Sequence, residues 1–600
     1  MKEVLKLIVG CLLLSACSEP ALQAPSSRAA VIEVPTNWAV YQKQRTDNIA
    51  LHIEKHKVAY ARFADFPVSQ THGVPYLLLK LLPKVAPEFW PDNENFLSVV
   101  GLYKDERNPG YPVARGIGFS GLSRDLRHNT VDAASFTCGG CHIGRVKDDR
   151  GKISYLDGGI NSEFSVIGFR KRMVDTFSYL SKNHKTKTAR DKAVISLFIA
   201  ALDKVEKELP GYFYNNYRFE DRLFDEAYEK NQIKLFRENA SKLIPQYVER
   251  IRQVYNGWRM LVEKNYPTAV KEMMDGYGGM EDAIGFNTVD AYLTLKKNPL
   301  TNLFAGIPVA DVGGQTDIMA VWDQQQRNPR WNAAKDDLID GGGQWNGHIP
   351  LPIYKNIAAQ LTLGVENIDV QVSAFSDELL DQLPAAAYPF ELDVTLARKG
   401  QKLFEENCQI CHQANNGKVY NDIGTHPGRA VIADSIISWA AVRSFTEACS
   451  PELTVIMHGK ENKPCGMYKG VSLKDKAKFA MTRPARHAGY NALPLAGIWA
   501  QAPYLHNGSI PTMYHLLMPQ TRPERFIKSR LSYDKEKMGF KWEMTGEGDD
   551  SGYLFDTTIS PALSNTGHDK DIIMNNNQFR LNWDNDESSV RALIEYMKVL

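Results

Sequence analysis

Two short cysteine motifs, far apart in the chain, carry the clearest chemical signal. Each has two cysteines three positions apart and a histidine directly after the second one: Cys138-Gly139-Gly140-Cys141-His142 and Cys408-Gln409-Ile410-Cys411-His412. This pattern is the signature of covalent c-type haem attachment, in which both thiols form thioethers with one porphyrin and the histidine ligates its iron. A zinc site built from both pairs and a thioredoxin-like dithiol are the alternatives, but neither requires that histidine. The sequence therefore predicts two covalently attached haems, with His142 and His412 as iron ligands.

The second motif must be held by elements around it, and two helices are expected there. Gly400, Phe404 and Cys408 fall on one stripe of the first helix. The other helix lies at the end of the sequence, and its apolar stripe consists of Val590, Leu593, Ile594, Met597 and Leu600. Because Gly400 has no side chain, an aromatic residue of the last helix, such as Tyr596, can approach it closely. Terminal helices that cross beside a haem are typical of cytochrome c domains, so residues 394 to 600 are expected to form one.

Size and composition indicate several soluble domains. The chain has 600 residues, more than one hydrophobic core usually supports. Hydrophobic residues make up 43% and charged residues 24%, as in ordinary folded proteins. The 71 basic and 70 acidic side chains leave a formal net charge of +1, so no field of one sign would attract nucleic acid. We expect a mainly α protein with two c-type cytochrome haem domains, long loops and a helical insertion, and no nucleic-acid partner.

The expected domain limits follow from composition shifts along the chain. Residues 1–16 are predicted to be a signal peptide, and residues 17–72 a lipid-anchored spacer and N-terminal segment. The N-terminal haem domain is expected at residues 73–383, with a helical insertion at about 181–265, where apolar residues recur at helical spacing. Polar turns, alanines and two prolines precede the C-terminal cytochrome c domain, which is expected at residues 384–600.

The first residues have the features of an export signal. An apolar run extends from Leu5 through Leu14, and Leu14-Ser15-Ala16-Cys17 then places small residues before a cysteine. This segment resembles a bacterial lipoprotein signal, which implies cleavage before Cys17 and a lipid anchor on its thiol; an ordinary cleaved signal peptide is the alternative. Both interpretations export the chain. Because Ser18 follows the cysteine, we expect a periplasmic or cell-surface lipoprotein, with the outer membrane favoured.

A long segment of the C-terminal half resembles a motif of a known haem-protein superfamily. Residues 497–512 read GIWAQAPYLHNGSIPT, close to the Ala-Pro-Tyr-x-His-(Asp/Asn)-Gly-Ser motif of the bacterial di-haem cytochrome c peroxidase superfamily. Within that superfamily the rubber oxygenase branch is the most similar. Three shorter N-terminal pieces also fit: Gly73-Val74-Pro75-Tyr76, Val100-Gly101-Leu102-Tyr103 and Asp157-Gly158-Gly159-Ile160-Asn161. The resemblance spans nearly the whole mature chain, apart from part of the helical insertion.

The resemblance implies iron ligands beyond the two motif histidines. In the rubber oxygenase branch a Gly-His pair near the C-terminus gives the second haem its sixth ligand, and Thr566-Gly567-His568 stands in that place. Met518 is the alternative, because members of the superfamily use a methionine downstream of the His506 motif. His506 itself is expected to orient a haem propionate or a backbone carbonyl. Residues 145 to 170 offer no family His or Met, so the first iron is expected to have an open face.

The resemblance also implies residues for electron and proton transfer. The superfamily places a tryptophan between the two haems, and Trp322 stands where that residue is expected, with Trp345 as the alternative. Peroxidase chemistry requires an acid or base near the first haem, and Glu163 is the candidate.

These residues point to an exported di-haem c-type cytochrome oxidoreductase of the peroxidase type. The second haem would store or relay an electron, and the first would bind the oxidant. Two alternatives are a haem dioxygenase that cleaves an apolar polymer or lipid and a non-catalytic electron-transfer lipoprotein. The expected partners are a small redox protein or quinone-linked electron donor, peroxide or dioxygen, and the membrane through Cys17. A bound calcium ion is left open, and Cys449 and Cys465 are expected to form a disulfide, with free thiols as the alternative.

Overall fold

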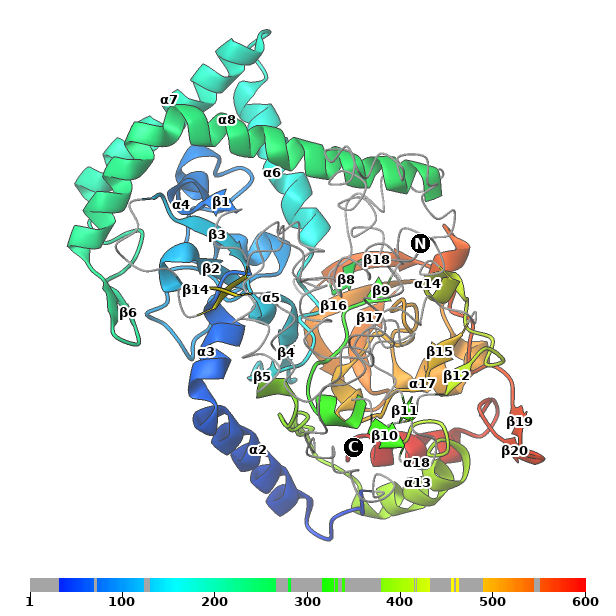
Figure 1. Ribbon diagram of the computed structural model, residues 1–600. Coiled ribbons are helices and arrows are strands. Elements are labelled where there is room, and N and C mark those ends of the chain that lie inside the picture. The colour runs from blue at the N-terminus through cyan, green and yellow to red at the C-terminus, as the bar shows by residue number, and fades with distance from the viewer. Residues whose placement is uncertain are drawn as a thin grey trace, which may run out of the picture.

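The computed structural model contains long helices and several β-sheets in its described parts (Figure 1). The structure describes residues 32–68, 73–123, 130–265, 279–281, 316–327, 330–332, 337–339, 379–414, 416, 418–431, 455–457, 460–462, 489–543 and 551–600. The leader with Cys17, the alternative tryptophan Trp345 and the pair Cys449 and Cys465 lie outside these residues. Among the described helices, none is both long enough and apolar enough to cross a membrane.

The N-terminal region surrounds the first cysteine motif with helices and short strands. Its elements are α2 (Trp38–Lys55), α3 (Lys57–Asp65), β1 (Val74–Pro75), α4 (Tyr76–Val85), η1 (Phe96–Val100), β2 (Ile117–Phe119), η2 (Ser120–Leu122), β3 (Ala133–Phe136), α5 (Cys138–His142), β4 (Ile143–Lys147) and β5 (Ile153–Asp157). The side chain of Asn37 accepts a hydrogen bond from the backbone N–H of Val40 (3.2 Å) and so caps α2. Strands β1, β3 and β2 form an antiparallel sheet in that order. Strand β3 leads directly into α5, which is the first cysteine motif.

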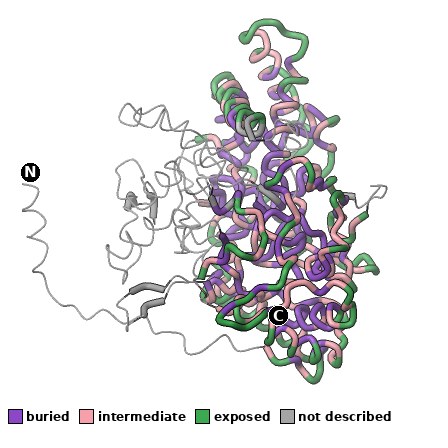
Figure 2. Tube along the Cα trace, turned by 90° about the vertical axis from the view of Figure 1, so that its right-hand side faces the viewer, coloured by how far each residue is buried: buried purple, intermediate pink, exposed green. Residues whose placement is uncertain are grey.

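Three helices and two short strands occupy the stretch from residue 166 to 265, where a helical insertion was predicted at about residues 181–265. Its elements are α6 (Val166–Ser181), α7 (Lys187–Glu208), β6 (Tyr217–Phe219), β7 (Arg222–Phe224) and α8 (Glu226–Asn265). Figure 1 shows the long helix α8 running across α6 and α7, and the three helices contact one another. Eight residues of the predicted apolar stripes are buried: Val194, Phe198, Leu202, Val205, Ile244, Tyr247, Val248 and Ile251. Figure 2 shows these helices with exposed turns outside and buried turns inside, as amphipathic packing requires.

The second half of the chain places short strands around the second motif. Its central elements are β8 (Met280–Glu281), β9 (Thr316–Asp317), η4 (Gln324–Arg327), β10 (Arg330–Asn332), β11 (Asp337–Ile339), α13 (Val394–Asn407), β12 (Val419–Tyr420), α14 (Gly428–Val431), β13 (Val455–Met457), β14 (Lys460–Asn462) and β15 (Tyr490–Asn491). They are followed by η7 (Ile498–Ala500), α17 (Met513–Leu517), η8 (Pro519–Thr521), β16 (Arg525–Asp534), β17 (Gly539–Glu543), β18 (Ser551–Asp556), η9 (Pro561–Leu563), β19 (Ile572–Met574), β20 (Asn577–Phe579) and α18 (Glu587–Met597). The second cysteine motif directly follows α13.

The largest described sheet contradicts the expected mainly α fold. It has five strands in the order β17-β16-β4-β5, with β18 also paired to β16. Together with several smaller sheets it makes the described structure a mixture of helices and strands, so the prediction of a mainly α cytochrome fold is wrong. Strand β4 follows the first motif and pairs in parallel with β16 at Ser532 and Lys147. The sheet thus joins the region of the first motif to the C-terminal half.

The apolar core also connects the two halves. One group of buried residues lies among α4, α6, α7 and α8. A second group brings together residues of both predicted domains, such as Ile143, Trp322 and Leu593. The half-buried side chains of Cys138 and Cys141 pack against both groups. The first motif therefore lies where the two cores meet, and the predicted domain limits stay predictions.

The crossing of the terminal helices is confirmed. Helix α13 packs against α18 so closely that a Cβ atom built on Gly400 would lie 1.8 Å from the carbonyl oxygen of Ala592. The rings of Phe404 and Tyr596 contact each other beside this crossing, with centroids 5.2 Å apart. Glycine is required at position 400 because the backbone of α18 occupies the space that a side chain would need.

We predict that Gly400→Ala destabilises the folded protein by about 3 kcal/mol, because the added methyl forces the two helices apart. The melting temperature of the haem-loaded protein measures this change. Lys402→Ala, on an exposed position of the same helix, is the matched control and should leave the melting temperature unchanged. Equal melting temperatures for the two variants would show that the crossing tolerates a methyl group.

Candidate haem sites

The second cysteine motif continues the last turn of α13. The backbone N–H of Cys408 donates to the carbonyl of Phe404 (2.8 Å), and that of His412 donates to the carbonyl of Cys408 (3.1 Å). The Nδ1 atom of His412 lies 2.7 Å from the carbonyl oxygen of Leu493. Because a carbonyl only accepts, Nδ1 carries the hydrogen and Nε2 is left as the metal-binding nitrogen. This arrangement suits a proximal haem ligand.

The predicted sixth ligand, His568, faces His412. The two rings are nearly parallel, with centroids 6.3 Å apart and an angle of 24° between the planes. An imidazole nitrogen binds a first-row metal at about 2.0 Å, and the ring centre lies about 1.2 Å further, so two imidazoles on opposite sides of one iron have centres roughly 6.4 Å apart. The observed separation fits one iron between the two histidines.

The loop that carries His568 is held by several backbone contacts. The backbone N–H of His568 donates to the carbonyl of Ile423 (2.9 Å). Arg522 donates to the carbonyls of Asn565 (2.7 Å) and Gly567 (2.8 Å). Gly567 has a φ of +125°, and a Cβ atom there would lie 2.3 Å from the hydroxyl oxygen of Thr425. The Gly-His pair therefore needs its glycine to bring the histidine into place.

A largely apolar cleft with about 1410 Å³ of empty space, including its open mouth, surrounds the two histidines. Buried polar atoms without a hydrogen-bond partner among the described residues line it: Thr425 Oγ1, Asn491 Oδ1, Trp583 Nε1 and His568 Nδ1. Cys408 and Cys411 lie on its wall. Such unsatisfied atoms are costly in a closed core but are useful around a bound group that carries carboxylates and a metal. The cleft therefore fits a covalently attached haem.

The protonation of these histidines also suits metal binding. Burial lowers the pKa of His412, and it lowers that of His568 to about 3, with the positive charges of His412 and Arg522 acting in the same direction. Both imidazoles are therefore neutral at physiological pH, which is the form that ligates iron. Among the described residues, no group of three or more His, Cys, Asp or Glu side chains is arranged to hold a metal ion. A haem iron needs only the two histidines, because the porphyrin supplies its other ligands.

The other two residues predicted for the second site, His506 and Met518, lie in different parts of the structure. His506 lines the cleft, and its ring stacks on Tyr490 with centroids 4.6 Å apart. Its Nε2 atom lies 3.2 Å from the hydroxyl of Tyr490, which itself donates to the carbonyl of His426 (2.7 Å). Met518 is buried in the core but is not among the described residues that line the cleft. The geometry therefore brings His568, and not Met518, to His412.

The first cysteine motif forms the short helix α5 and is fixed by a loop that follows β5. Asn161 donates from its side-chain amide to the carbonyls of Gly101 (3.0 Å) and Gly140 (2.9 Å), and its backbone N–H donates to the carbonyl of Cys141 (2.8 Å). Burial lowers the pKa of His142 to about 4, while a hydrogen bond to the backbone of Met319 acts in the opposite direction. His142 is therefore neutral and able to bind iron.

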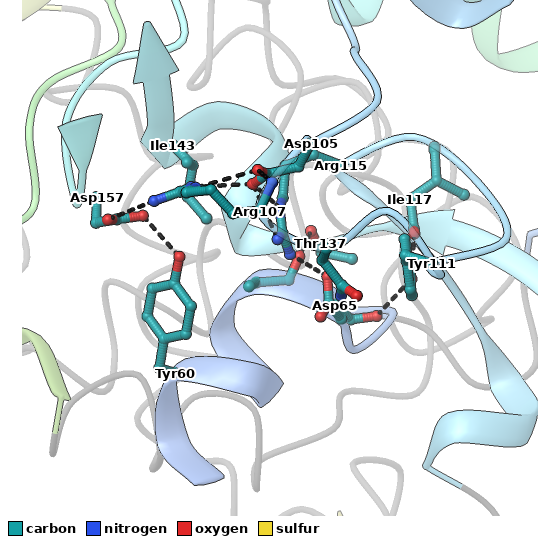
Figure 3. Close-up of polar contacts among 12 residues, drawn as sticks. Tyr60, Asp65, Asp105, Arg107, Tyr111, Arg115, Ile117, Thr137, Ile143 and Asp157 are labelled. Atoms are coloured by element: carbon teal, nitrogen blue, oxygen red, sulfur yellow. Dashed lines mark hydrogen bonds and ion pairs between the residues drawn. The ribbon is translucent and has the colours of Figure 1, made fainter. Parts of the chain in front are cut away.

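A buried network of charges, which the sequence did not reveal, lies beside the first motif (Figure 3). Arg115 pairs with Asp65 and Asp105, and Arg107 bridges Asp105 (2.9 Å) and Asp157 (2.9 Å). Figure 3 shows these side chains together with Thr137 and Ile143, which flank the motif on either side. Buried ion pairs are costly to break because removing one partner leaves an uncompensated charge.

This network anchors the chain around α5. The hydroxyl of Tyr60 donates to Asp157 (2.7 Å), and that of Thr137 donates to the carbonyl of Ala64 (2.7 Å). The hydroxyl of Tyr103 donates to the carbonyl of Ile143 (2.8 Å). The ends of the first motif are therefore tied to α3 and to the loop around residue 105.

The predicted distal residue Glu163 forms an ion pair. Its carboxylate lies 2.7 Å from a terminal nitrogen of Arg145, whose guanidinium covers the ring of Tyr103 at 3.7 Å. The carboxylate of Glu163 is therefore engaged by Arg145. The role of Glu163 as an acid or base at the first haem stays a prediction.

Residues 316–323, which we name the bridging segment, connect the two sites. The backbone N–H of Asp317 donates to the carbonyl of His506 (2.6 Å), and Asp317 and Ile318 line the cleft of the second site. Met319 contacts His142 of the first site. In the sequence, Trp322 alone pointed to a function for this segment. Its other residues show no motif and no regular periodicity.

Trp322 of the bridging segment is fully buried between the two halves. Its indole N–H donates to the carbonyl of Ala496 (2.8 Å), and a Cβ atom on Gly497 would lie only 2.4 Å from the ring. On the other side, a Cβ atom on Gly159 would lie 3.0 Å from the ring. Gly159 belongs to the loop that holds the first motif, and Ala496 directly follows Leu495, which lines the cleft of the second site. Trp322 therefore contacts residues beside both sites.

Comparison with known proteins gives partial matches. Residues 58–142 match a family model described as a Y4iN-like domain, and residues 489–527 match one described as RoxA-like, cytochrome c-like. The chain is 35% identical over 301 residues to the uncharacterized protein y4iM of Sinorhizobium fredii (strain NBRC 101917 / NGR234), covering 47% of this chain and 64% of that relative. It is 45% identical over 82 residues to the uncharacterized protein y4iJ of the same strain, covering 13% of each.

The chain thus spans less than two thirds of the length of each of these relatives. The RoxA-like match covers Tyr490 and His506, which line the cleft around His412 and His568. The Y4iN-like match ends at the first motif. The cytochrome c-like match therefore covers part of the lining of the cleft, and it suggests haem binding there.

Proposed function

We propose that the protein is an exported di-haem c-type cytochrome oxidoreductase of the peroxidase type. The observation that carries this proposal is the pair His412 and His568, which face each other at 6.3 Å inside the cleft of the second motif. Haem, once attached, supplies one-electron chemistry, and an iron with an open face also binds peroxide or dioxygen.

The residues of the second site favour electron transfer. His412 and His568 would hold the iron of a haem bound in the cleft, and together they would leave no open position for peroxide or dioxygen at that metal. Trp583 and Thr425 offer buried donors to the propionates of the group in the cleft. The wall of the cleft is mostly apolar, and such surroundings tune the electronic properties of a bound metal.

Trp322 is the proposed relay between the sites. Its ring packs against Gly159 and Gly497, one on the side of each motif, and its N–H is held by Ala496. An aromatic ring in this position gives an electron a path through bonded and packed atoms. The bridging segment also reaches both sites, because Asp317 donates to the carbonyl of His506 and the backbone of Met319 lies near His142.

The first site is the proposed place for the oxidant. The motif and the absence of a family ligand in residues 145 to 170 motivate the proposal that only His142 ligates this iron. The partners proposed are a small redox protein or quinone-linked donor and peroxide. Two further proposals are a lipid anchor on Cys17, which would place the protein in the periplasm or on the outer membrane, and a bound calcium ion.

An electron paramagnetic resonance spectrum of the oxidised, haem-loaded protein tests the division of roles. We expect a low-spin signal from the His412 and His568 site and a high-spin signal from the site of His142. Peroxide should change the high-spin signal first. A wholly low-spin spectrum would favour an electron carrier, and dioxygen binding without peroxide turnover would favour a dioxygenase.

A further inference from the structure

A second cavity, separate from the cleft around His412 and His568, lies between helices α6 and α8 and the strands β1 to β3. It has about 670 Å³ of empty space, including its open mouth, and none of its described lining residues belongs to either cysteine motif. Its inner wall is apolar and closed: Leu79 is 0%, Ile117 2% and Ala134 1% exposed. Phe136 and Phe169 add aromatic surface from β3 and α6. A mostly apolar cavity with few polar groups is typical of a site for a small ligand.

Three polar side chains converge on this cavity. Arg170 comes from α6, and Tyr247 and Arg250 come from α8. Arg170 is 5% exposed and Tyr247 9% exposed, whereas Arg250 is half-buried. The hydroxyl of Tyr247 is buried, and no hydrogen bond to the described residues satisfies it. A buried hydroxyl of this kind needs an explanation, because such groups are almost always bonded.

Both arginines line the same cavity as Tyr247. Burial raises the pKa of Tyr247, and the charges of Arg170 and Arg250 both act in the opposite direction. The cavity therefore has an apolar body and a positively charged edge with a hydroxyl that can donate. A carboxylate accepts from guanidinium and phenol groups at once, and charge assistance makes such bonds strong.

We propose that this cavity binds a medium-chain alkyl carboxylate, with its head at Arg170, Tyr247 and Arg250 and its chain along Phe136, Phe169 and Ile251. Two cationic side chains at the edge select against alkyl ammonium ions, and a neutral alcohol would lose the charge-assisted bonds. The site is independent of the haem proposal. It lies beside β3, which ends two residues before Cys138, so an occupant would contact the strand that precedes the first motif.

Calorimetric titration of the full-length, haem-loaded protein with decanoate tests the proposal. We expect decanoate to bind at one site, below its micelle-forming concentration. Decan-1-ol should bind at least about tenfold more weakly, because it lacks the charge that the arginines recognise. Decyltrimethylammonium should not bind.

Two variants distinguish specific binding of decanoate at this site from nonspecific binding of an alkyl chain to apolar surface. Tyr247→Phe removes only the hydroxyl, and Arg250→Gln removes one charge at the open edge; each should weaken decanoate binding about tenfold and leave decanol binding unchanged. Arg252→Gln is the matched control, because Arg252 lies on the same helix and does not line the cavity. Melting curves establish that each variant is folded.

Several outcomes would overturn the proposal. One is the absence of decanoate binding to the wild-type protein. Another is equal affinity for decanoate and decanol, which would indicate apolar binding alone. A third is an equal loss of affinity in Arg250→Gln and Arg252→Gln, which would indicate a general effect of surface charge.

Discussion

Replacing His568 with alanine is expected to convert the C-terminal haem from low-spin to high-spin. The reason is geometric: His568 lies directly across from His412, and alanine leaves one axial position without a nitrogen. Losing a strong axial nitrogen weakens the ligand field, so the low-spin signal of the oxidised protein should disappear while the covalent haem content is unchanged. Electron paramagnetic resonance and a pyridine haemochrome assay on the same sample measure both quantities.

Met518→Leu is the matched control for this experiment. Met518 is buried but does not line the cleft, so its replacement by a similar apolar side chain should leave the spectrum unchanged. If Met518→Leu abolished the low-spin signal and His568→Ala preserved it, methionine would be the ligand and the geometry described for His568 would be irrelevant to the metal.

Replacing both cysteines of either motif with alanine is expected to halve the covalent haem content. Each motif supplies the two thiols for one porphyrin, so Cys138→Ala with Cys141→Ala, or Cys408→Ala with Cys411→Ala, removes one attachment site. The pyridine haemochrome assay, compared with protein concentration, should fall from two haems to one for each chain. Removing the second motif should also abolish the low-spin signal, because His412 belongs to that site.

The control for the second motif is Ile410→Ala. Ile410 lies between its two cysteines and is 37% exposed, so shortening it leaves both thiols in place and should preserve haem content. An unchanged haem content in the cysteine variants would refute covalent attachment at that motif.

The parts of the site that the sequence predicted depend on short, local patterns. The cysteine motifs are contiguous, and the crossing of α13 with α18 followed from Gly400 and an apolar stripe of helical period. His568 was indicated by a family resemblance, and the structure places it opposite His412. Each of these signals is contained in a few neighbouring residues, so it can be found without knowing the fold.

The parts that were missed depend on contacts between distant segments. Strand β16 was not recognised because its inward positions include Lys528, which is 1% exposed and lies 4.0 Å from the ring of Phe540. A lysine at an inward position interrupts the apolar alternation by which strands are recognised. The network of Arg115 and its carboxylates could not be predicted either, since ion pairing leaves no periodic pattern in the sequence.

The parallel pairing of β4 with β16 has a consequence for how the protein matures. Ribosomes make the chain from its N-terminus, so the first motif and β4 are complete long before β16 has been synthesised. Until then one edge of β4 has no partner, and such an edge is prone to pair wrongly. The thiols of Cys138 and Cys141 would thus be accessible for haem attachment before β16 is made. Pairing of β16 with β4 then completes the sheet beside the first motif.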